Sequence, residues 1–235
     1  MEPFFSVGVK ENFLFDIYEQ KSIKKLAKSL GPMWKYADYK SNPIETKLNK
    51  FGYRTKQDYL PDEYYLMLGC SHTFGQYLHD KDTAANMLEI QLGKPIINLG
   101  IRGGASNAMA QNLQRLMMSS YQKPKAIFAQ WPEIYRYTFF AENSVKNITA
   151  GVKEPKRLLI FKYLLNMPKV FQTASNHAYE YVNSLGIPVI NYSLNGCSAD
   201  YFGIKEIDRI DFARDNLHAG AETNKKIASF VMEKL

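Results

Sequence analysis

Residues 64–75 read YYLMLGCSHTFG, an apolar run that stops at a turn of small residues carrying Ser71. The run shows no polar alternation, which is the pattern of a strand covered on both faces in a parallel sheet. In open parallel sheets, ligands bind outside the carboxyl ends of the strands. The stretch therefore predicts a buried strand over residues 64–68 that delivers the Ser71 hydroxyl to that edge. The plainer alternative is that Ser71 is simply a small residue suited to a tight turn between strand and helix.

A serine hydroxyl becomes an effective nucleophile only when a base removes its proton and a third group orients the base. Residues 213–231, ARDNLHAGAETNKKIASFV, contain Asp215 three residues before His218. A turn entering a helix can place this carboxylate against the imidazole Nδ1. The alternative for Asp215 is a helix cap that accepts backbone N–H groups, and the two roles are compatible.

Four segments resemble the sequence blocks of the SGNH (GDSL) hydrolase family. Residues 69–71 (GCS) resemble its Gly-Asp-Ser block, and residues 215–218 (DNLH) resemble its Asp-x-x-His block. Residues 49–54 (NKFGYR) are similar to an Asn-x-x-Gly-Phe-Arg segment that precedes the serine in many members. Residues 97–103 (INLGIRG) resemble the second block, whose glycine, Gly103 here, gives a backbone N–H to the oxyanion hole. The resemblance spans residues 49–235 and implies a flavodoxin-like fold with a triad of Ser71, His218 and Asp215.

The chain departs from the family pattern at two places. Cys70 replaces the aspartate of the first block, where the family's triad acid does not lie, and we expect it to be a core residue. Residues 129–133 (AQWPE) stand where a Gly-x-Asn-Asp block should follow the next strand, so the asparagine that donates to the oxyanion is missing. Gln130 carries the same amide on a longer stem and is the expected substitute. Loss of one oxyanion donor lowers turnover by about 10²–10³, so the alternative is a protein with weak or no catalytic activity.

Short β-rich runs alternate with helical segments from Phe51 onward, which predicts a three-layer α/β/α domain with a parallel sheet of about five strands. The division expected is a basic extension over residues 1–48 and a hydrolase-like domain over residues 49–235. The expected strands cover residues 64–68, 95–99, 126–131, 187–192 and 209–213. Helices are expected over residues 17–30, 84–92, 107–121, 157–185 and 223–235, with a break near Pro168. Residues 132–154 are expected to cross over the site, and residues 196–198 (GCS) to form a loop.

The 235 residues carry 30 Lys and Arg against 23 Asp and Glu, a net charge of +7. The stretch from Lys21 to Asp58 holds ten of the basic and three of the acidic residues, so the excess lies there. It is either a surface for an anionic partner or a solvated cover, and the absence of a nucleic-acid motif favours the cover. No apolar run of about 18 residues and no signal-peptide pattern occurs, which predicts a cytoplasmic protein without membrane contact. Two cysteines without metal-ligand spacing indicate neither a disulfide framework nor a zinc site.

Together these features predict a serine esterase that needs no cofactor and acts on a small-molecule ester or acylated sugar. His72 and Trp131 are expected to line its pocket, and Glu133, Tyr135, Arg136 and Tyr137 to extend the wall. A charged and aromatic wall favours short acyl groups, acetyl above all, because a long acyl chain calls for an aliphatic lining. A binding or structural module and an acyltransferase on the same fold are the alternatives. The oligomeric state is left open.

Overall fold

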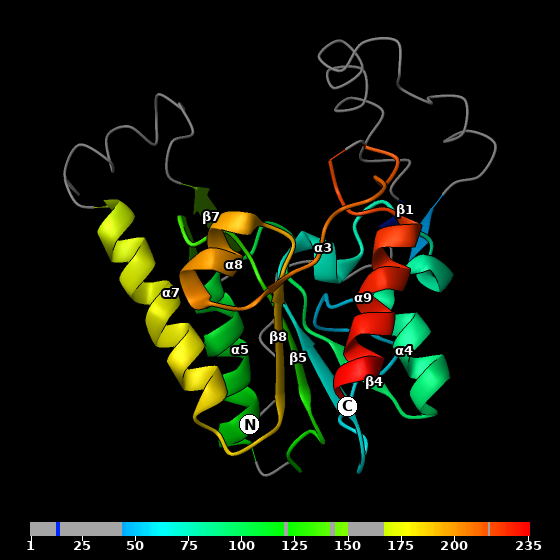
Figure 1. The fold of residues 1–235 in the computed structure, drawn as a ribbon. Helices are drawn as coiled ribbons and strands as arrows, with labels where there is room; N and C mark the ends of the chain where they lie inside the picture. Colours follow the sequence, from blue (N-terminus) through cyan, green and yellow to red (C-terminus); the bar gives the residue numbers. More distant parts are fainter. Residues whose placement is uncertain (1–12, 15–43, 120–121, 142–143, 150–166, 216) are drawn as a thin grey trace.

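The computed structural model describes residues 13–14, 44–119, 122–141, 144–149, 167–215 and 217–235 (Figure 1). The expected helix over residues 17–30, and most of the basic extension, lie outside these ranges. At the boundary of the extension, β1 (Phe13–Leu14) pairs antiparallel with β2 (Glu45–Thr46). Within the described residues no helix is long and apolar enough to cross a bilayer.

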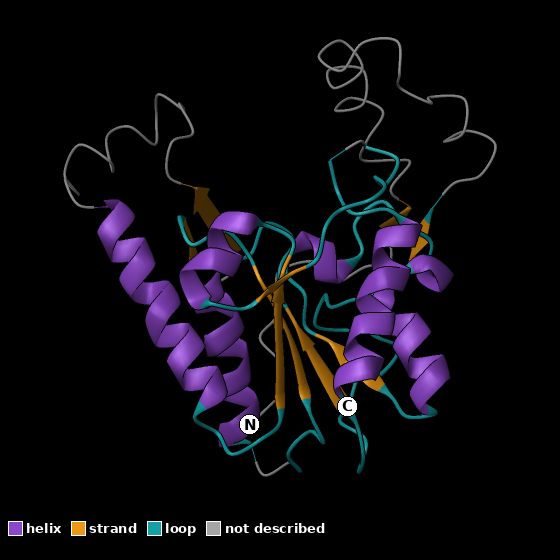
Figure 2. Ribbon diagram, viewed as in Figure 1, coloured by secondary structure: helices purple, strands orange, loops and turns teal. Residues whose placement is uncertain are grey.

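The core of the molecule is a five-stranded parallel sheet in the order β4-β3-β5-β8-β9 (Figure 2). Its strands are β3 (Tyr65–Leu68), β4 (Ile96–Asn98), β5 (Ile127–Trp131), β8 (Val189–Ser193) and β9 (Lys205–Glu206). Numbered along the chain, this order is 2-1-3-4-5, which is the flavodoxin-like order. Every residue of β4 and β5 is buried, including the polar Asn98 and Gln130 near their carboxyl ends, as expected for strands covered on both faces. The predicted fold class is confirmed.

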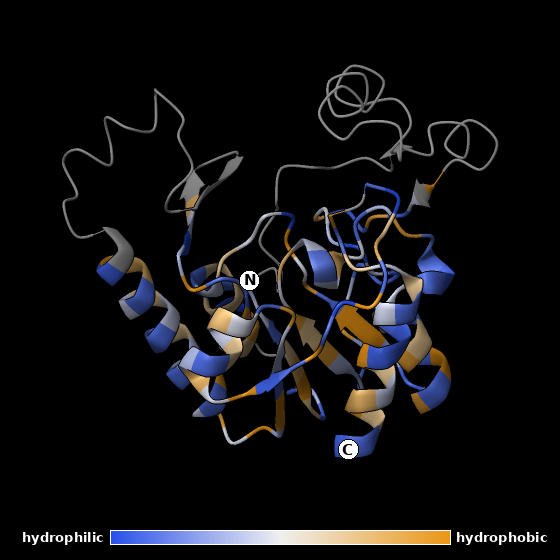
Figure 3. Ribbon diagram, turned by 45° about the horizontal axis from the view of Figure 1, so that its top comes forward, coloured by the Kyte–Doolittle hydropathy of each residue, from blue (hydrophilic) through white to orange (hydrophobic). Residues whose placement is uncertain are grey.

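Helices cover both faces of the sheet (Figure 1). On one face, α5 (Ser106–Met118) and α7 (Met167–Asn183) bury Leu113 and Val182 with the alternate strand residues Leu66 and Leu68. On the other face, α4 (Ala84–Leu92) and α9 (Ala221–Lys234) pack on the remaining strand residues. The helices carry hydrophilic and hydrophobic segments in turn, as expected for elements with one buried face (Figure 3).

Helix boundaries follow local sequence signals. The Thr83 hydroxyl accepts the Asn86 N–H and caps α4, which ends at Gly93 in a left-handed conformation. Helix α5 begins at Ser106 itself, so the residue in its capping position is Ala105, which has no side chain that could accept a hydrogen bond. Helix α7 begins at Met167, so Pro168 lies in its first turn, where its missing N–H costs nothing.

Two predictions at the sheet's edge are wrong. The fifth strand is Lys205–Glu206, not residues 209–213, because an exposed two-residue edge strand leaves no hydrophobic signal. Residues 209–213 instead lead into the loop before α9. Residues 196–198 do not form a loop but begin α8 (Gly196–Phe202), since the Asn195 side chain accepts the Ser198 N–H and caps the helix.

The segment expected to cross over the site contains a hairpin of β6 (Arg136–Ala141) and β7 (Ser144–Thr149). Thr138 ties β6 to the start of α5. Its hydroxyl accepts the Ala105 N–H at 2.9 Å, and its backbone exchanges hydrogen bonds with the Asn107 amide at 2.8 and 3.0 Å. The first residue of this hairpin, Arg136, therefore lies at a fixed position beyond the end of β5.

Candidate active site

Ser71 lies at the carboxyl end of β3, as the first residue of the short helix α3 (Ser71–Phe74). Helix α3 ends at Gly75, whose φ of 73° is a left-handed conformation that favours glycine. The Gly75 N–H donates to the His72 carbonyl, and the Gln76 N–H donates to the Ser71 carbonyl. These bonds close a tight turn that holds the Ser71 side chain at the edge of the sheet.

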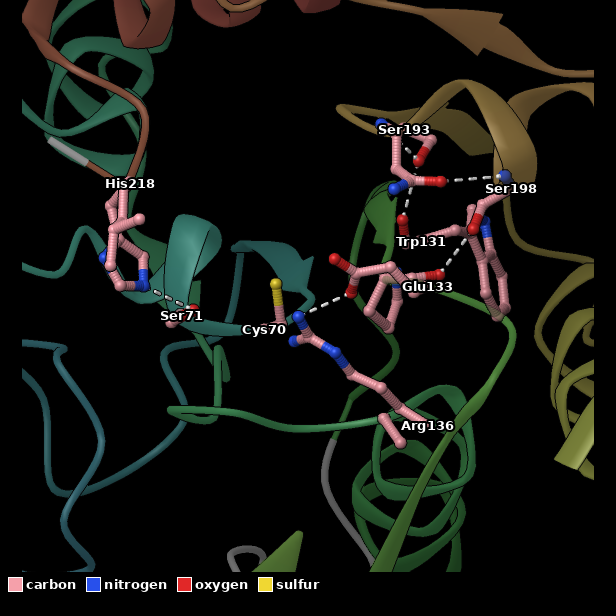
Figure 4. A network of polar contacts seen from close by, with 12 residues as sticks. Cys70, Ser71, Trp131, Glu133, Arg136, Ser193, Ser198 and His218 are labelled. Atoms are coloured by element: carbon pink, nitrogen blue, oxygen red, sulfur yellow. Dashed lines mark hydrogen bonds and ion pairs between the residues drawn. The ribbon is translucent and has the colours of Figure 1, made fainter. Parts of the chain in front are cut away.

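His218, from the far end of the chain, reaches Ser71 (Figure 4), and Asp215 contacts the other nitrogen of the His218 ring. The His218 Nε2 lies 2.9 Å from the Ser71 Oγ, and the His218 Nδ1 lies 2.5 Å from the Asp215 Oδ2. When Nδ1 carries the proton, Nε2 is free to accept the serine hydroxyl, which is the tautomer required of a base. The structure therefore brings together the three residues that the sequence predicts as a triad.

Asp215 is 2% exposed and uses both of its oxygens. Oδ1 accepts the backbone N–H groups of Leu217 and His218 at 3.1 Å each, while Oδ2 faces the imidazole. Asp215 is not the helix cap weighed as its alternative, because α9 begins only at Ala221 with Gly220 as its capping residue, and the two backbone N–H groups that it accepts belong to its own turn. Burial alone would raise the pKa of this carboxyl, but the hydrogen bonds from His218 and the backbone outweigh it and hold the pKa below its usual range.

The loop that carries Asp215 and His218 is closed at its base. The Ala213 N–H donates to the His218 carbonyl at 2.8 Å, and Phe212 pairs with Ala219 in an isolated antiparallel bridge. Asp211 then fixes the loop to the start of α9: its carboxylate accepts the Thr223 N–H at 2.7 Å, the Thr223 hydroxyl at 2.6 Å and the Glu222 N–H at 3.0 Å. Sequence reasoning missed Asp211, although an acidic residue that caps a helix from a distant turn follows a known preference.

His72 packs beside the triad histidine, with 5.1 Å between the two ring centroids. Its Nδ1 accepts the Ala219 N–H at 3.1 Å, which places the proton of the neutral ring on Nε2. Burial, with the positive charge of His218 next in importance, lowers the pKa of His72 to about 3. His72 is thus a neutral donor, and it borders the cavity expected of it.

Gln130 lies under the nucleophile turn, buried to 2% exposure. Its Oε1 accepts the Thr73 hydroxyl at 3.1 Å, the Cys70 thiol at 3.2 Å and the Cys70 N–H at 3.4 Å. Its Nε2 donates to the Trp131 carbonyl at 3.1 Å. The oxygen of this amide, not its nitrogen, therefore faces the turn, so Gln130 supports the nucleophile strand and does not present the donor expected for an oxyanion.

Two of the segments that resemble family blocks pack against the same turn. The Arg54 guanidinium donates to the Leu78 carbonyl at 2.7 Å and also reaches the Gly75 carbonyl, so it holds the end of α3. In the loop after β4, a Cβ on Gly100 would lie 2.5 Å from the Phe74 nitrogen, so only glycine fits. Gly103 adopts a φ of 68°, a left-handed conformation, and the Ile101 N–H ties this loop to the Gly69 carbonyl at 3.0 Å.

Of the aromatic residues predicted to line the pocket, Trp131 borders the small cavity beside Cys70, whereas Tyr137 does not. The Trp131 ring is fully buried between Tyr179 and Phe202, and its Nε1 donates to Asn191 at 2.9 Å. The Tyr137 ring stacks on Phe171 at 5.5 Å. The Trp131 ring belongs to the core because α7 and α8 offer it aromatic partners, whereas the Tyr137 ring is half-buried against α7. These are tertiary contacts that the strand sequence does not contain.

The charged members of the wall do lie beside the nucleophile turn. Glu133 and Arg136 form an ion pair of 2.6 Å next to Cys70 (Figure 4). The Ser193 and Ser198 hydroxyls fix the chain between β5 and this pair by donating to the carbonyls of Trp131 and Pro132 at 2.8 and 2.9 Å. Glu133 borders a cavity of about 30 Å³ together with Cys70, His72, Gln130, Trp131 and Arg209.

Cys70 fits its expected role as a core residue. It is 1% exposed, and burial raises the pKa of its thiol, which makes it a poor nucleophile. Among the described residues, no group of three His, Cys, Asp or Glu side chains is arranged to hold a metal ion.

Comparison with known proteins finds only distant similarities, all of them to solved structures. No protein-family model and no curated protein matches the chain. Three solved structures are similar to it: a member of the lipolytic G-D-S-L family from Veillonella parvula, the SGNH-hydrolase family esterase AlinE4, and the psychrotrophic esterase EstA from Pseudoalteromonas sp.. Their identities are 14%, 16% and 13%, and their TM-scores 0.39, 0.41 and 0.39. The matches cover 73%, 74% and 73% of this chain and 97%, 95% and 95% of theirs.

Proposed function

We propose that the chain is a serine esterase of SGNH type. The observation that carries the proposal is the continuous line of contacts from the Ser71 hydroxyl through His218 to the buried Asp215 carboxylate. If Ser71 only formed a turn, an imidazole at 2.9 Å from its hydroxyl would serve no purpose. If Asp215 only accepted backbone N–H groups, its second oxygen would not require an imidazole. The geometry satisfies both distance requirements of nucleophilic catalysis.

The reaction follows from these contacts. His218 Nε2 takes the serine proton as Ser71 Oγ bonds to the ester carbonyl carbon, and the imidazolium returns that proton to the departing alcohol oxygen as its C–O bond breaks. Water then attacks the acyl-serine, with His218 removing and returning a proton in the same way. Asp215 holds the imidazole in the required tautomer and stabilises its charged form. No cofactor is required by these steps.

The oxyanion of each tetrahedral intermediate needs N–H donors. The backbone N–H groups of Ser71 and Gly103 are the candidates that the family resemblance supplies. Gln130 acts instead by holding the turn that carries Ser71, because its oxygen is committed to Cys70 and Thr73. With one side-chain donor fewer, turnover is expected to be about 10²–10³ lower than in an enzyme with the complete set.

The cavity beside the nucleophile favours a short acyl group. Its volume of about 30 Å³ corresponds to roughly two or three water-sized spheres, which suits an acetyl group better than a long chain. The test is hydrolysis of p-nitrophenyl acetate and p-nitrophenyl octanoate by purified protein. We expect slow turnover of the acetate, at least tenfold higher kcat/KM for it than for the octanoate, and loss of both in Ser71→Ala. Activity that survives in folded Ser71→Ala would remove Ser71 from the mechanism, and equal or faster octanoate hydrolysis would exclude the short-acyl preference.

A further inference from the structure

The turn that follows the nucleophile helix holds a tyrosine in a backbone conformation that tyrosine does not favour. The Leu78 N–H donates to the Gly75 carbonyl at 3.2 Å, so residues 75–78 form a β-turn with Tyr77 at its third position. The φ of Tyr77 is 64°, and among the described residues no other residue except glycine has a positive φ. A turn with a positive φ at this position usually carries glycine or asparagine, because other side chains are strained in the left-handed region. The tyrosine therefore needs an explanation.

The Arg54 guanidinium holds this turn at both ends. Arg54 is 7% exposed, and it donates to the Gly75 carbonyl and, at 2.7 Å, to the Leu78 carbonyl. Its Nε and Nη2 also donate to the Asp80 carboxylate at 2.9 and 2.6 Å, which fixes the guanidinium itself. A strained backbone conformation persists only where its surroundings impose it, and such residues cluster at functional sites. The hydrogen bonds of Arg54 impose it here, on either side of Tyr77.

This turn places the Tyr77 ring against the base of the triad. The ring centroid of Tyr77 lies 5.8 Å from that of the His218 imidazole, with 42° between the two planes, which is within the range of interacting aromatic pairs. Tyr77 also packs on the small apolar cluster of Ile44 and Phe74, the last residue of α3. The half-buried ring therefore connects the helix that carries Ser71 to the imidazole that is to accept the serine proton.

We propose that Tyr77 is a positioning residue for His218. The inference rests on the proposed esterase function and adds a residue that acts only through the base. Asp215 holds one ring nitrogen of His218, and an imidazole held at one atom can still turn about that contact. The rings of Tyr77 and His72, which pack on this imidazole, limit the motion, so that Nε2 stays 2.9 Å from the Ser71 hydroxyl. Since proton transfer requires this geometry, loss of the Tyr77 ring should lower kcat and leave KM almost unchanged.

The experiment compares Tyr77→Asn, which suits the left-handed conformation but has no ring, with Tyr77→Phe, which keeps the ring. On p-nitrophenyl acetate we expect kcat to fall at least about tenfold in Tyr77→Asn and to stay within about twofold of the wild type in Tyr77→Phe, with KM almost unchanged in both. Tyr181→Asn removes a half-buried ring on α7 and should leave both constants unchanged in the folded protein. If Tyr77→Asn does not fold, Tyr77→Gly, which relaxes the backbone further, takes its place with the same expectation.

A second measurement does not depend on esterase activity. Nitrogen NMR of protein with isotope-labelled histidine distinguishes the two neutral tautomers of each ring. His218 should be in the Nδ1–H form in the wild type and in Tyr77→Phe, and should shift toward a mixture of both forms in Tyr77→Asn, while His72 keeps its Nε2–H form. An unchanged kcat in folded Tyr77→Asn, or an equal loss in Tyr77→Phe, would overturn the proposal. If the wild type has no esterase activity, the proposed function fails, and an unchanged His218 tautomer in Tyr77→Asn would then overturn this inference separately.

Discussion

The role of Gln130 depends on the direction in which its side-chain amide points. An amide at the end of β5 was expected to donate to the substrate, and the sequence places it correctly at the edge of the sheet. Its oxygen nevertheless faces Cys70 and Thr73, because the turn after β3 presents it with an N–H, a thiol and a hydroxyl. The sequence predicts the element and its end, whereas the orientation of the amide depends on a turn 57 to 60 residues away.

Removing this acceptor should therefore affect both stability and turnover. Gln130→Met keeps the length of the side chain but leaves the Thr73 hydroxyl and the Cys70 N–H without a partner. We expect a loss of about 1–3 kcal/mol in the free energy of unfolding, measured with urea, and a lower kcat on p-nitrophenyl acetate. Gln122→Met, at an exposed position, should change neither. Unchanged stability in Gln130→Met would show that these hydrogen bonds do not hold the turn.

His72 should make stability depend on pH. Its pKa is lowered to about 3 in the folded protein, so between that value and about 6.5 the unfolded chain binds more protons than the folded chain. The contribution of neutral His72 is therefore complete above about pH 6.5 and is lost as the pH falls toward 3, at no more than about 1.4 kcal/mol per pH unit.

Comparing the free energy of unfolding at pH 7 and pH 5 in His72→Asn tests this dependence. An Asn side chain keeps an acceptor for the Ala219 N–H but does not titrate. The decrease in stability between the two pH values should be smaller in His72→Asn than in the wild type. His177→Asn, at an exposed position on α7, should retain the wild-type decrease. The same decrease in wild type and His72→Asn would contradict the assignment of a buried neutral ring.

At the level of elements, the loop that precedes α9 determines the position of His218. The strands β3, β4, β5 and β8 could be predicted from the sequence because each is a short, mostly apolar run. This loop has no such run, and its shape comes from the Asp211 carboxylate and the bridge between Phe212 and Ala219.

Asp211→Ala should loosen this loop, although Asp211 itself takes no part in the proposed reaction. It removes the acceptor of the Thr223 N–H and hydroxyl and of the Glu222 N–H at the positive end of α9. We expect a loss of about 1–2 kcal/mol in stability and a fall in kcat with little change in KM, because His218 would no longer be held at hydrogen-bond distance. Asp208→Ala, which removes an exposed ion pair to Lys226, should leave stability and kcat almost unchanged. Equal effects of the two substitutions would contradict a positioning role for Asp211.

At the level of the whole molecule, the parallel sheet brings together residues 147 positions apart in the chain. Ser71 follows a central strand, and the loop before α9 returns to the same carboxyl edge (Figure 1). The order and spacing of the motifs predicted this meeting. The cavity beside Cys70 was not predicted as a unit, since Glu133 and Arg209, which both line it, come from segments far apart in the sequence.

The central claim is that Ser71 is a nucleophile activated by His218. The most direct measurement is the stoichiometry of covalent labelling by a fluorophosphonate probe, read by mass spectrometry of the intact protein and mapped to a peptide. The geometry predicts one label per chain at Ser71, a rate reduced by at least 10³ in His218→Ala, and no label in Ser71→Ala. Folded wild-type protein that remains unlabelled, or that is labelled as fast in His218→Ala, would contradict the proposed catalytic role.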